Sequence, residues 1–576
     1  MNRDGMLSAV RVGAIAGICM VFAITIGFVE AVSRREVLRD VLPLSTVLLL
    51  IVGVITGVLA VRTSTRGPEP TMGAALPRGV IAGAVAGAII AAYALLAESV
   101  DLRAVFTNLS PSAIETVTFD QGIGVGALIL VIGGAALGAL GAILRLLPPL
   151  PTRMVIAAGL TVVVLSIMEQ VFRVMLSELG LGAVGSLFYS SGALTLLGAL
   201  IIAVVTAALV WLARARRSPV RAQLARVTGR PDRRTSLLLY VLVGAALLIL
   251  PQIVGRFPSD VLGTAGLYIL LGLGLNIVVG YAGLLDLGYV AFYAIGSYSI
   301  AMLTSPQSFL ALELNFWLVL PLVILLAAIA GIVIGAPVLR LRGDYLAIVT
   351  LGFGEIVRLL FLSDWLKEFT NAGQGILGIP PPTLPGLEFP GRDPQEIYYP
   401  ILLACVLAAI VAYRLANSRV GRAWNAMRED ESVAEATGIN TTNYKLLAFA
   451  LGAVFGCLSG ALFAAKIGSI FPHSFEILVS ITALAVIILG GMGSIPGVIV
   501  GGLVLVGLPE FLREFDEYRL LVYGAVLVAM MLLRPEGLVP SATRQRELHE
   551  ADDPDDQYDA DAGAETGEPV ITGARA

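Results

Sequence analysis

The sequence predicts an all-α, polytopic helical membrane protein with about 16 membrane-spanning segments. Apolar runs of nearly twenty residues recur along the whole chain, and a helix of that length can cross the hydrocarbon core of a bilayer. Hydrophobic residues make up 57% of the 576 residues and charged residues only 14%, against about 25% charged residues in an average soluble protein. Because the runs are continuous and do not alternate, they exclude a transmembrane β-barrel.

Residues 1–213 form a first membrane module of six predicted spans, whose role the sequence does not indicate. The connections at 62–78 and 145–153 carry arginines, and the connection at 98–121 between them is mainly acidic. By the positive-inside rule, this pattern predicts a cytoplasmic N-terminus. The 30–40 connection, with three arginines, is the exception. The six spans are placed near 8–29, 41–61, 79–97, 122–144, 154–172 and 191–213.

Residues 214–235 form an arginine-rich linker, predicted to be cytoplasmic, that separates the first module from a second one at 236–540. Counting spans from this linker places the polar 417–444 loop in the cytoplasm as well. Two segments, at 476–489 and 497–511, are shorter than a full span and could be half-helices or a re-entrant pair. The ten predicted spans lie near 237–254, 261–280, 284–303, 317–338, 345–362, 398–416, 446–467, 476–489, 497–511 and 519–533.

Residues 541–576 form an acidic tail, predicted to be cytoplasmic and disordered.

The sequence lacks the residues that several functions require. The two histidines and three cysteines have no metal-site or disulfide spacing, so we expect no metal and no cofactor. Topology and anionic lipid suffice to explain the arginine linker, so we expect no nucleic-acid partner. The chain has no Walker A pattern and cannot hold ATP in that way.

The stretch 339–360, LRLRGDYLAIVTLGFGEIVRLL, places two charges inside an apolar helix. Gly343-Asp344 supplies a break and a helix cap. Glu355 follows about 16 Å further along the helix, near mid-bilayer depth, where an unpaired charge is costly. Arg358 is three residues further on and shares its face. The two side chains are predicted to be either an internal ion pair or part of a translocation path.

Two glycine-rich stretches interrupt apolar runs of the second module. In GYAGLLDLGYVAFYAIGSY, glycines at 280, 283 and 288 place Asp286 beside flexible backbone. Broken helices with a polar group form substrate paths in many transporters, so Asp286 is a candidate for such a path. The alternative is a tight cytoplasmic turn that Asp286 caps. The second interruption contains Gly490, Gly491 and Gly493, which are also predicted to break a helix. Lys466 and Glu476 are candidates for an outer vestibule, although Lys466 could instead extend its charge to the interface.

The stretch 417–445, NSRVGRAWNAMREDESVAEATGINTTNYK, is too long and too polar for a simple membrane turn. It predicts a short helix from Arg428 to Ala436, with Gly438 as the residue that stops it. The alternative is a solvated amphipathic loop without a partner.

RLRGDYLAIVTLGFGEIVR and LGYVAFYAIGSY resemble the M-type inner-membrane permease of the high-affinity branched-chain amino acid ABC transporters. The resemblance covers about residues 237–540 and leaves the first module without a counterpart. It implies that the 417–445 loop holds a cytoplasmic coupling helix that binds an ATPase. Asp286 stands where the family is expected to have a smaller or apolar residue, so a role for it is not implied. The residues implied for coupling are Arg428, Glu429, Asp430, Glu431, Glu435 and Gly438.

That coupling stretch departs from the general EAA-x-x-x-G pattern of importers, because Ser432-Val433-Ala434 stand where EAA is expected. It keeps the Gly-Ile-Asn ending of the M-type family at Gly438-Ile439-Asn440.

The resemblance implies a permease subunit that moves branched-chain amino acids, or related small zwitterions, inward across the cytoplasmic membrane of a prokaryote. Such a subunit is not an enzyme, because its ATP hydrolysis resides on partners. The implied partners are an H-type permease, two cytoplasmic ABC ATPases, an extracytoplasmic binding protein and membrane lipid. The alternative is a stand-alone, ion-coupled secondary transporter, for which Glu355, Arg358 and Asp286 would have to form an ion relay. Such a carrier leaves the long polar loop unexplained.

Overall fold

The chain is described here by a computed structural model. It divides into two compact units, one up to Ala246 and one from Leu247 onward, and each is described separately. The structure describes residues 3–541 except for 40, 62–71, 101, 103–104, 179, 181, 191, 216–232, 340, 342, 384–392, 512–520, 522–523, 526, 529, 531–533 and 535. Most of the arginine linker, more than half of the predicted span at 519–533 and nearly all of the acidic tail therefore lie outside the described residues.

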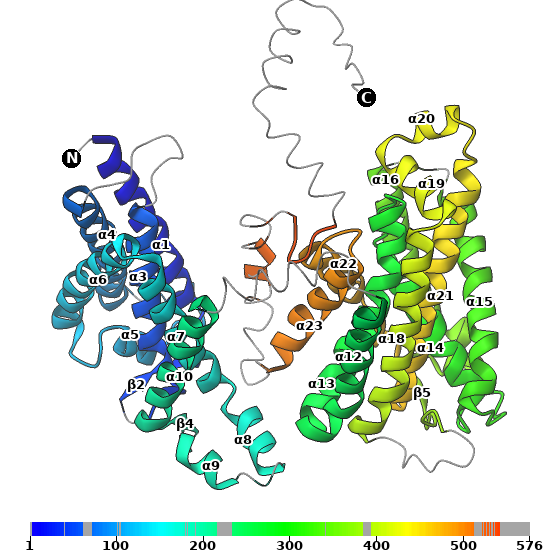
Figure 1. The fold of residues 1–576 in the computed structure, drawn as a ribbon, viewed down its shortest axis with the longest axis horizontal. Coiled ribbons are helices and arrows are strands. Elements are labelled where there is room, and N and C mark those ends of the chain that lie inside the picture. The colour runs from blue at the N-terminus through cyan, green and yellow to red at the C-terminus, as the bar shows by residue number, and fades with distance from the viewer. Residues whose placement is uncertain are drawn as a thin grey trace, which may run out of the picture. The chain divides into compact units, whose positions relative to one another are not determined.

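The first unit is a bundle of long apolar helices joined by short helices and a small sheet (Figure 1). Its long helices are α1 (Arg3–Thr25), α3 (Leu44–Val61), α4 (Met72–Ser99), α6 (Ile123–Leu146), α7 (Pro149–Ile167) and α10 (Leu196–Ala215). Its short helices are α2 (Phe28–Ser33), α5 (Pro111–Val117), α8 (Glu169–Glu178) and α9 (Gly182–Phe188). The centre of this unit is the contact of α4 with α1 and α6.

Glycines form the interface between α4 and α6. A Cβ added to Gly83 would lie 2.0 Å from the carbonyl oxygen of Gly134, and one added to Gly79 would lie 2.4 Å from that of Gly138. The two backbones are therefore in direct contact, as small residues allow in membrane helices. The glycines at 79, 83, 134 and 138 are thus the positions at which α4 and α6 meet.

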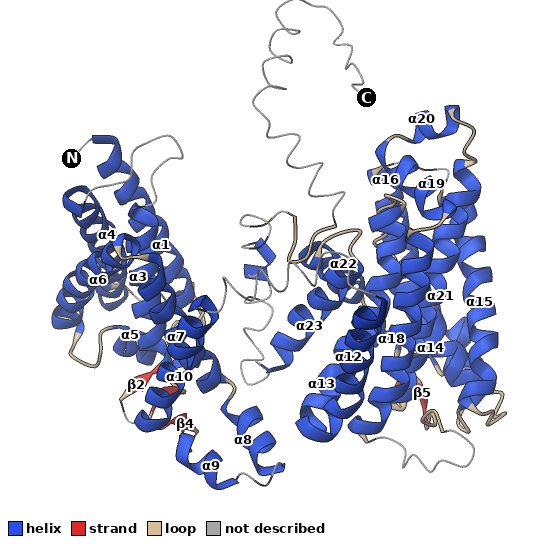
Figure 2. Ribbon diagram, in the orientation of Figure 1, coloured by secondary structure: helices blue, strands red, loops and turns tan. Residues whose placement is uncertain are grey.

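A four-stranded sheet at one end of the first unit accounts for two arginines of the 30–40 connection, which departs from the positive-inside pattern (Figure 2). Arg35 donates from Nη1 to the carbonyl of Ile167 at the end of α7, 2.9 Å away, and Arg39 donates to Ser190 Oγ at 2.7 Å. These arginines hold helix and strand ends together, so their presence need not report the cytoplasmic side. The strands, in sheet order, are β2 (Leu42–Pro43), β1 (Glu36–Leu38), β4 (Ala193–Leu194) and β3 (Tyr189–Ser190).

The second unit begins inside α12 (Arg233–Val254). The remaining long helices are α13 (Arg256–Leu275), α14 (Val290–Thr304), α15 (Phe316–Val338), α16 (Asp344–Leu362), α18 (Pro394–Ala416), α21 (Thr441–Ile467), α22 (Ile477–Gly490) and α23 (Ile495–Phe511). Short helices lie at α17 (Lys367–Thr370), α19 (Arg419–Glu429) and α20 (Glu431–Ala436). Strands β5 (Ile376–Leu377) and β6 (Ser469–Ile470) form an antiparallel pair.

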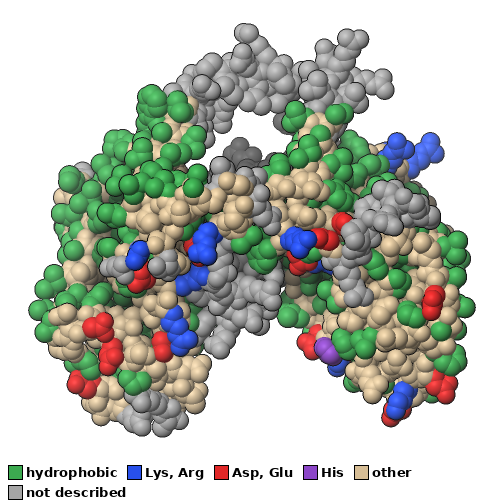
Figure 3. Space-filling view, turned by 90° about the horizontal axis from the view of Figure 1, so that it is seen from below, with side chains coloured by type: hydrophobic (Ala, Val, Ile, Leu, Met, Phe, Trp, Pro, Cys, Tyr) green, Lys and Arg blue, Asp and Glu red, His purple; other side chains and the backbone are tan. Residues whose placement is uncertain are grey.

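Helices α13 and α21 form the buried centre of the second unit. Helix α13 contacts α18, α21, α22 and α23, and α21 contacts α14 and α15. Helix α15 instead exposes large aliphatic side chains, with Leu318 69% and Val333 64% exposed. Figure 3 shows hydrophobic side chains along the outer edges of either unit, with charged side chains in small groups among other side chains and backbone. An apolar outside around a packed centre is the arrangement that lipid requires.

The helices account for the predicted spans, although several of their boundaries are shifted. Among the described residues, eleven helices are long and apolar enough to cross a membrane, and four shorter apolar helices match the remaining predicted spans other than 519–533. The span predicted at 154–172 ends at Ile167, because the polar α8 follows. The span predicted at 191–213 starts later because residues 193–194 form a strand, and the one predicted at 284–303 starts at Val290 after a glycine-rich turn.

Candidate functional site

The polar loop after α18 folds into two helices rather than one. Ser418 caps α19 by accepting a hydrogen bond from the N–H of Val420 at 3.1 Å. Asp430 then adopts an extended conformation, and its carboxylate accepts hydrogen bonds from the N–H groups of Ser432 (2.8 Å) and Val433 (3.0 Å). The prediction of a single helix from Arg428 to Ala436 was therefore wrong, because the Asp430 side chain interrupts α19 and begins α20.

Two buried contacts fix these helices to α21. Trp424 of α19 is fully buried and donates from Nε1 to the carbonyl of Tyr444 at 2.8 Å. Glu431 of α20 forms an ion pair with Lys445, whose side chain is only 7% exposed, at 2.6 Å. The loop is therefore held as a defined surface feature, since both of its helices are tied to the central helix of the unit.

Helix α20 and the residues on either side of it are open on one face. Val433 (59% exposed) and Glu435 are exposed within α20, as are Glu429 before it and Gly438 after it. Gly438 ends the helix with φ of +90°, donating to the carbonyl of Glu435 at 3.0 Å, while Ile439 donates to that of Ala434 at 3.1 Å. This is a Schellman motif, which places Gly438 at the stop position that the sequence indicated. An exposed apolar residue therefore lies among carboxylates on a helix that the Glu431–Lys445 ion pair holds in place.

The first glycine-rich stretch breaks the chain between α13 and α14. Residues 276–281 form a π-helix, η2 (Asn276–Tyr281), and an irregular turn follows up to α14. Gly283 in this turn has φ of +72°, and a Cβ at Gly288 would lie 1.8 Å from the carbonyl oxygen of Thr350 on α16. The turn therefore needs glycine at the first position for its conformation and at the second for its contact. We call residues 276–289 the α13 break.

Asp286 is bonded within this break. It is 2% exposed, and its Oδ1 accepts a hydrogen bond from the N–H of Gly288 at 2.9 Å. The neighbouring N–H of Leu287 donates to Thr350 Oγ1 at 3.0 Å. The second carboxylate oxygen of Asp286, Oδ2, has no hydrogen-bond partner among the described residues. These bonds resemble those of a turn-capping carboxylate.

Glu355 and Arg358 bond to each other on α16. Arg358 Nε donates to both carboxylate oxygens of Glu355, at 3.1 and 3.0 Å, and Nη2 donates to Oε1. The Arg358 side chain is 22% exposed and that of Glu355 is 43% exposed, beside the exposed Ile348 and Ile356. The pair therefore lies on an outward face of a membrane helix, where lipid is a costly neighbour for charge.

The second glycine-rich stretch forms the turn between α22 and α23. Gly490 is the last residue of α22, and Gly491 and Gly493 follow with φ of +121° and +76°. The turn is joined to the α13 break by Asn276, which is 1% exposed and accepts a hydrogen bond on Oδ1 from the N–H of Gly493 at 2.8 Å. Sequence reasoning did not select Asn276. Its only signal is a lone amide in an apolar run just before Gly280.

Lys466 forms buried contacts in the last turn of α21. Its Nζ lies 2.9 Å from the Asp260 carboxylate and donates to Thr264 Oγ1 at 2.6 Å, and the side chain is 6% exposed. It therefore ties α21 to α13, and its burial does not favour a place in an outer vestibule. The Asp260 side chain is 46% exposed, so the alternative, in which Lys466 extends its charge to the interface, stays a prediction.

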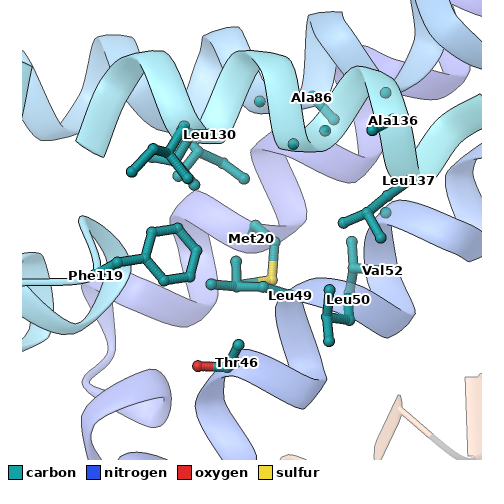
Figure 4. A pocket seen from close by; sticks show the side chains of 17 residues that line it. Met20, Thr46, Leu49, Leu50, Val52, Ala86, Phe119, Leu130, Ala136 and Leu137 are labelled. Atoms are coloured by element: carbon teal, nitrogen blue, oxygen red, sulfur yellow. The ribbon is translucent and has the colours of Figure 1, made fainter. Parts of the chain in front are cut away.

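The first unit contains an apolar cavity of about 320 Å³ between α1, α3, α4 and α6 (Figure 4). Met20, Leu49, Phe119 and Leu137 are among its lining residues, and Thr46 is the one lining residue with a polar side chain. A zwitterion in this cavity would have to leave both of its charges without partners, at a cost of several kcal/mol (about 2–7 for a single unpaired polar group, more for a charge). We therefore exclude the cavity as an amino-acid site.

The packed helices, the two backbone breaks and the projecting polar loop are the architecture of a multi-pass membrane protein. Its relatives are transport permease proteins and not enzymes. The family described as "Branched-chain amino acid transport system / permease component" matches residues 257–531. The high-affinity branched-chain amino acid transport system permease protein LivM of Salmonella typhimurium is 45% identical over 319 residues, covering 52% of this chain and 73% of LivM. This chain belongs to that permease family.

Two further relatives support this assignment. The LivM protein of Escherichia coli is 44% identical over 328 residues, covering 53% of this chain and 76% of LivM. The permease protein LivH of Escherichia coli is 27% identical over 289 residues, covering 47% of this chain and 91% of LivH. No solved structure matches the chain. The family match begins at residue 257, after the first unit.

Proposed function

We propose that this chain is the M-type permease subunit of an ABC importer and that it moves leucine, isoleucine or valine, or a related small zwitterion, into the cell. One observation carries the proposal: the exposed helix α20 is held rigidly to α21 through the Glu431–Lys445 ion pair. A carrier that works alone has no need of such a projecting element, whereas a permease driven by separate ATPases needs a surface that receives their motion. The names of the relatives support the choice of cargo.

Uptake into proteoliposomes tests this function. The vesicles contain the chain, an H-type permease and two ATPases, with loaded binding protein and radiolabelled leucine outside and ATP inside. We expect uptake that requires ATP and stops when the Walker A lysine of the ATPases is replaced. Uptake by the chain alone, driven by a proton or sodium gradient without ATP, would instead establish the ion-coupled carrier.

We propose that the chain lies in the cytoplasmic membrane of a prokaryote with both termini in the cytoplasm. The arginines at 62–78 and 145–153 and in the linker support this orientation. The three arginines of the 30–40 connection are weak evidence against this orientation, because Arg35 and Arg39 bond to other parts of the first unit. The first unit stays a membrane module without an assigned role, and lipid is the expected neighbour of the exposed aliphatic helices.

We further propose that Glu355 and Arg358 act as a structural pair, covered in the assembled transporter by protein or water.

Glu355→Gln and Arg358→Gln should each lower the thermal stability of the solubilised protein, and the double change should recover part of the loss, because a single change leaves one charge unpaired. A double-mutant cycle of melting temperatures measures this coupling. If the pair lines the path instead, the variants will be stable and lose uptake, and the double change will not recover it. A coupling energy of zero with two fully stable single variants contradicts the structural pair.

A further inference from the structure

The α13 break is the point where three parts of the second unit meet. Its π-helix replaces regular α-helical bonds with wider ones, such as the N–H of Ala282 bonded to the carbonyl of Ile277 at 3.1 Å. Short π-helical segments are rare and occur frequently at functional sites. A helix end wound in this way carries carbonyl groups that a side chain from a neighbouring element can bind.

Arg428, near the end of α19, supplies that side chain. Its Nη1 donates a hydrogen bond to the carbonyl of Gly280 at 2.9 Å. The same residue lies directly on the following turn, since a Cβ added to Gly283 would lie 2.9 Å from Arg428 Cγ and 3.2 Å from its Cα. A charged donor to a carbonyl makes a stronger bond than a neutral one. Helix α19 is thus fixed to the α13 break by one side chain and by backbone contact.

Asn276 extends this contact to the turn between α22 and α23. The hydrogen bond from Gly493 N–H to Asn276 Oδ1 crosses from that turn to the π-helix. A Cβ added to Gly280 would lie 2.8 Å from the nitrogen of Gly493, so the two backbones touch at the residue that Arg428 holds. A displacement of α19 would therefore reach α13 and the α22–α23 turn together.

We infer that Arg428 is a positioning residue that transmits the movement of the coupling loop to the α13 break and the α22–α23 turn. The inference rests on the proposed function, because it takes α20 as the surface that the ATPase moves. It assigns Arg428 to the inner, transmitting side of the loop and not to the ATPase-binding side. Helix α20 with Glu435 and the exposed Val433 then forms the binding side.

Hydrogen–deuterium exchange on the purified full chain tests the contact itself. In Arg428→Met, amides of residues 276–289 should exchange roughly tenfold faster than in the unchanged protein, the factor expected for losing one hydrogen bond to a charged group. Arg428→Lys keeps a donor and should recover part of the protection. The matched control is Arg422→Met, an exposed arginine on the same helix, which should leave this segment unchanged. Equal exchange in all four proteins would overturn the inference.

Proteoliposome assays test the transmitting role. In Arg428→Met, the ATPases should still co-purify, and their hydrolysis should still respond to loaded binding protein. Leucine taken up per ATP should fall about tenfold or more, within the usual range of coupling between sites. An unchanged ratio, or loss of ATPase binding, would overturn the assignment of Arg428 to the transmitting side. If the unchanged complex takes up no leucine, the proposed function fails, while the exchange experiment still decides whether Arg428 holds the break.

Discussion

Glu435→Lys and Gly438→Pro are each expected to abolish most ATP-driven uptake while the chain stays in the membrane at a near-normal level. Glu435 is exposed on α20, so reversing its charge alters a binding surface and leaves the fold intact. A loss of about 2 kcal/mol, typical for an important interface residue, weakens ATPase binding about 30-fold. Gly438 has φ of +90° and an N–H bonded to Glu435, and proline can provide neither.

Co-purification of the ATPases and uptake into proteoliposomes measure these effects. Ser432→Ala is the matched control, because Ser432 is also exposed on α20 and the change preserves charge. The role of α20 would be disproved by variants that still bind the ATPases and whose hydrolysis loaded binding protein still stimulates.

Gly460→Val is expected to prevent the second unit from folding. A Cβ at Gly460 would lie 2.0 Å from the carbonyl oxygen of Tyr293, and one at Gly296 would lie 2.1 Å from that of Cys457, so α14 and α21 touch along their backbones. Ser297 donates across the same contact to the carbonyl of Gly460 at 2.8 Å. Valine must separate the helices, which costs about 3 kcal/mol or more in a well-packed core.

Size-exclusion chromatography of the solubilised, fluorescently tagged chain measures this outcome. Gly460→Val should give aggregate or no protein, and Gly296→Val should do the same. Gly244→Val is the control, since a Cβ at Gly244 meets no atom within 4 Å. A symmetric, monodisperse peak for Gly460→Val would contradict the packing described here.

Hydropathy alone predicted the helical spans well, because lipid forces each apolar run into a helix. Boundaries were shifted where a local polar or backbone feature competed with hydropathy. The span predicted at 154–172 stops before Glu169, which is paired with Arg173 in the next helix. The small sheet at residues 36–43 and 189–194 was not predicted, since strands of two or three residues carry no period.

For the candidate site, the sequence indicated which residues matter better than it indicated which residues they contact. Gly438 was predictable because a positive φ at a helix end favours glycine. The split at Asp430 was not, since a carboxylate inside a helical pattern can face solvent or cap a new helix, and only tertiary contacts decide. The contacts of Asn276 and Arg428 with the α13 break depend on a π-helix, which leaves no distinct hydrophobic period.

Helices α14 and α22, one beside each break, are shorter than the other long helices of the second unit. Helix α14 has 15 residues and α22 has 14, so they are about 21–23 Å long, against a hydrocarbon thickness of about 30 Å. Neither helix reaches across that layer by itself, so the chain beside each of them has to complete the crossing. Large buried side chains fill this region: Tyr289, Tyr293 and Phe475 are 0%, 5% and 1% exposed, and the ring centroids of Tyr293 and Phe475 lie 5.8 Å apart. The two short helices are therefore closed off by aromatic packing rather than by helix length.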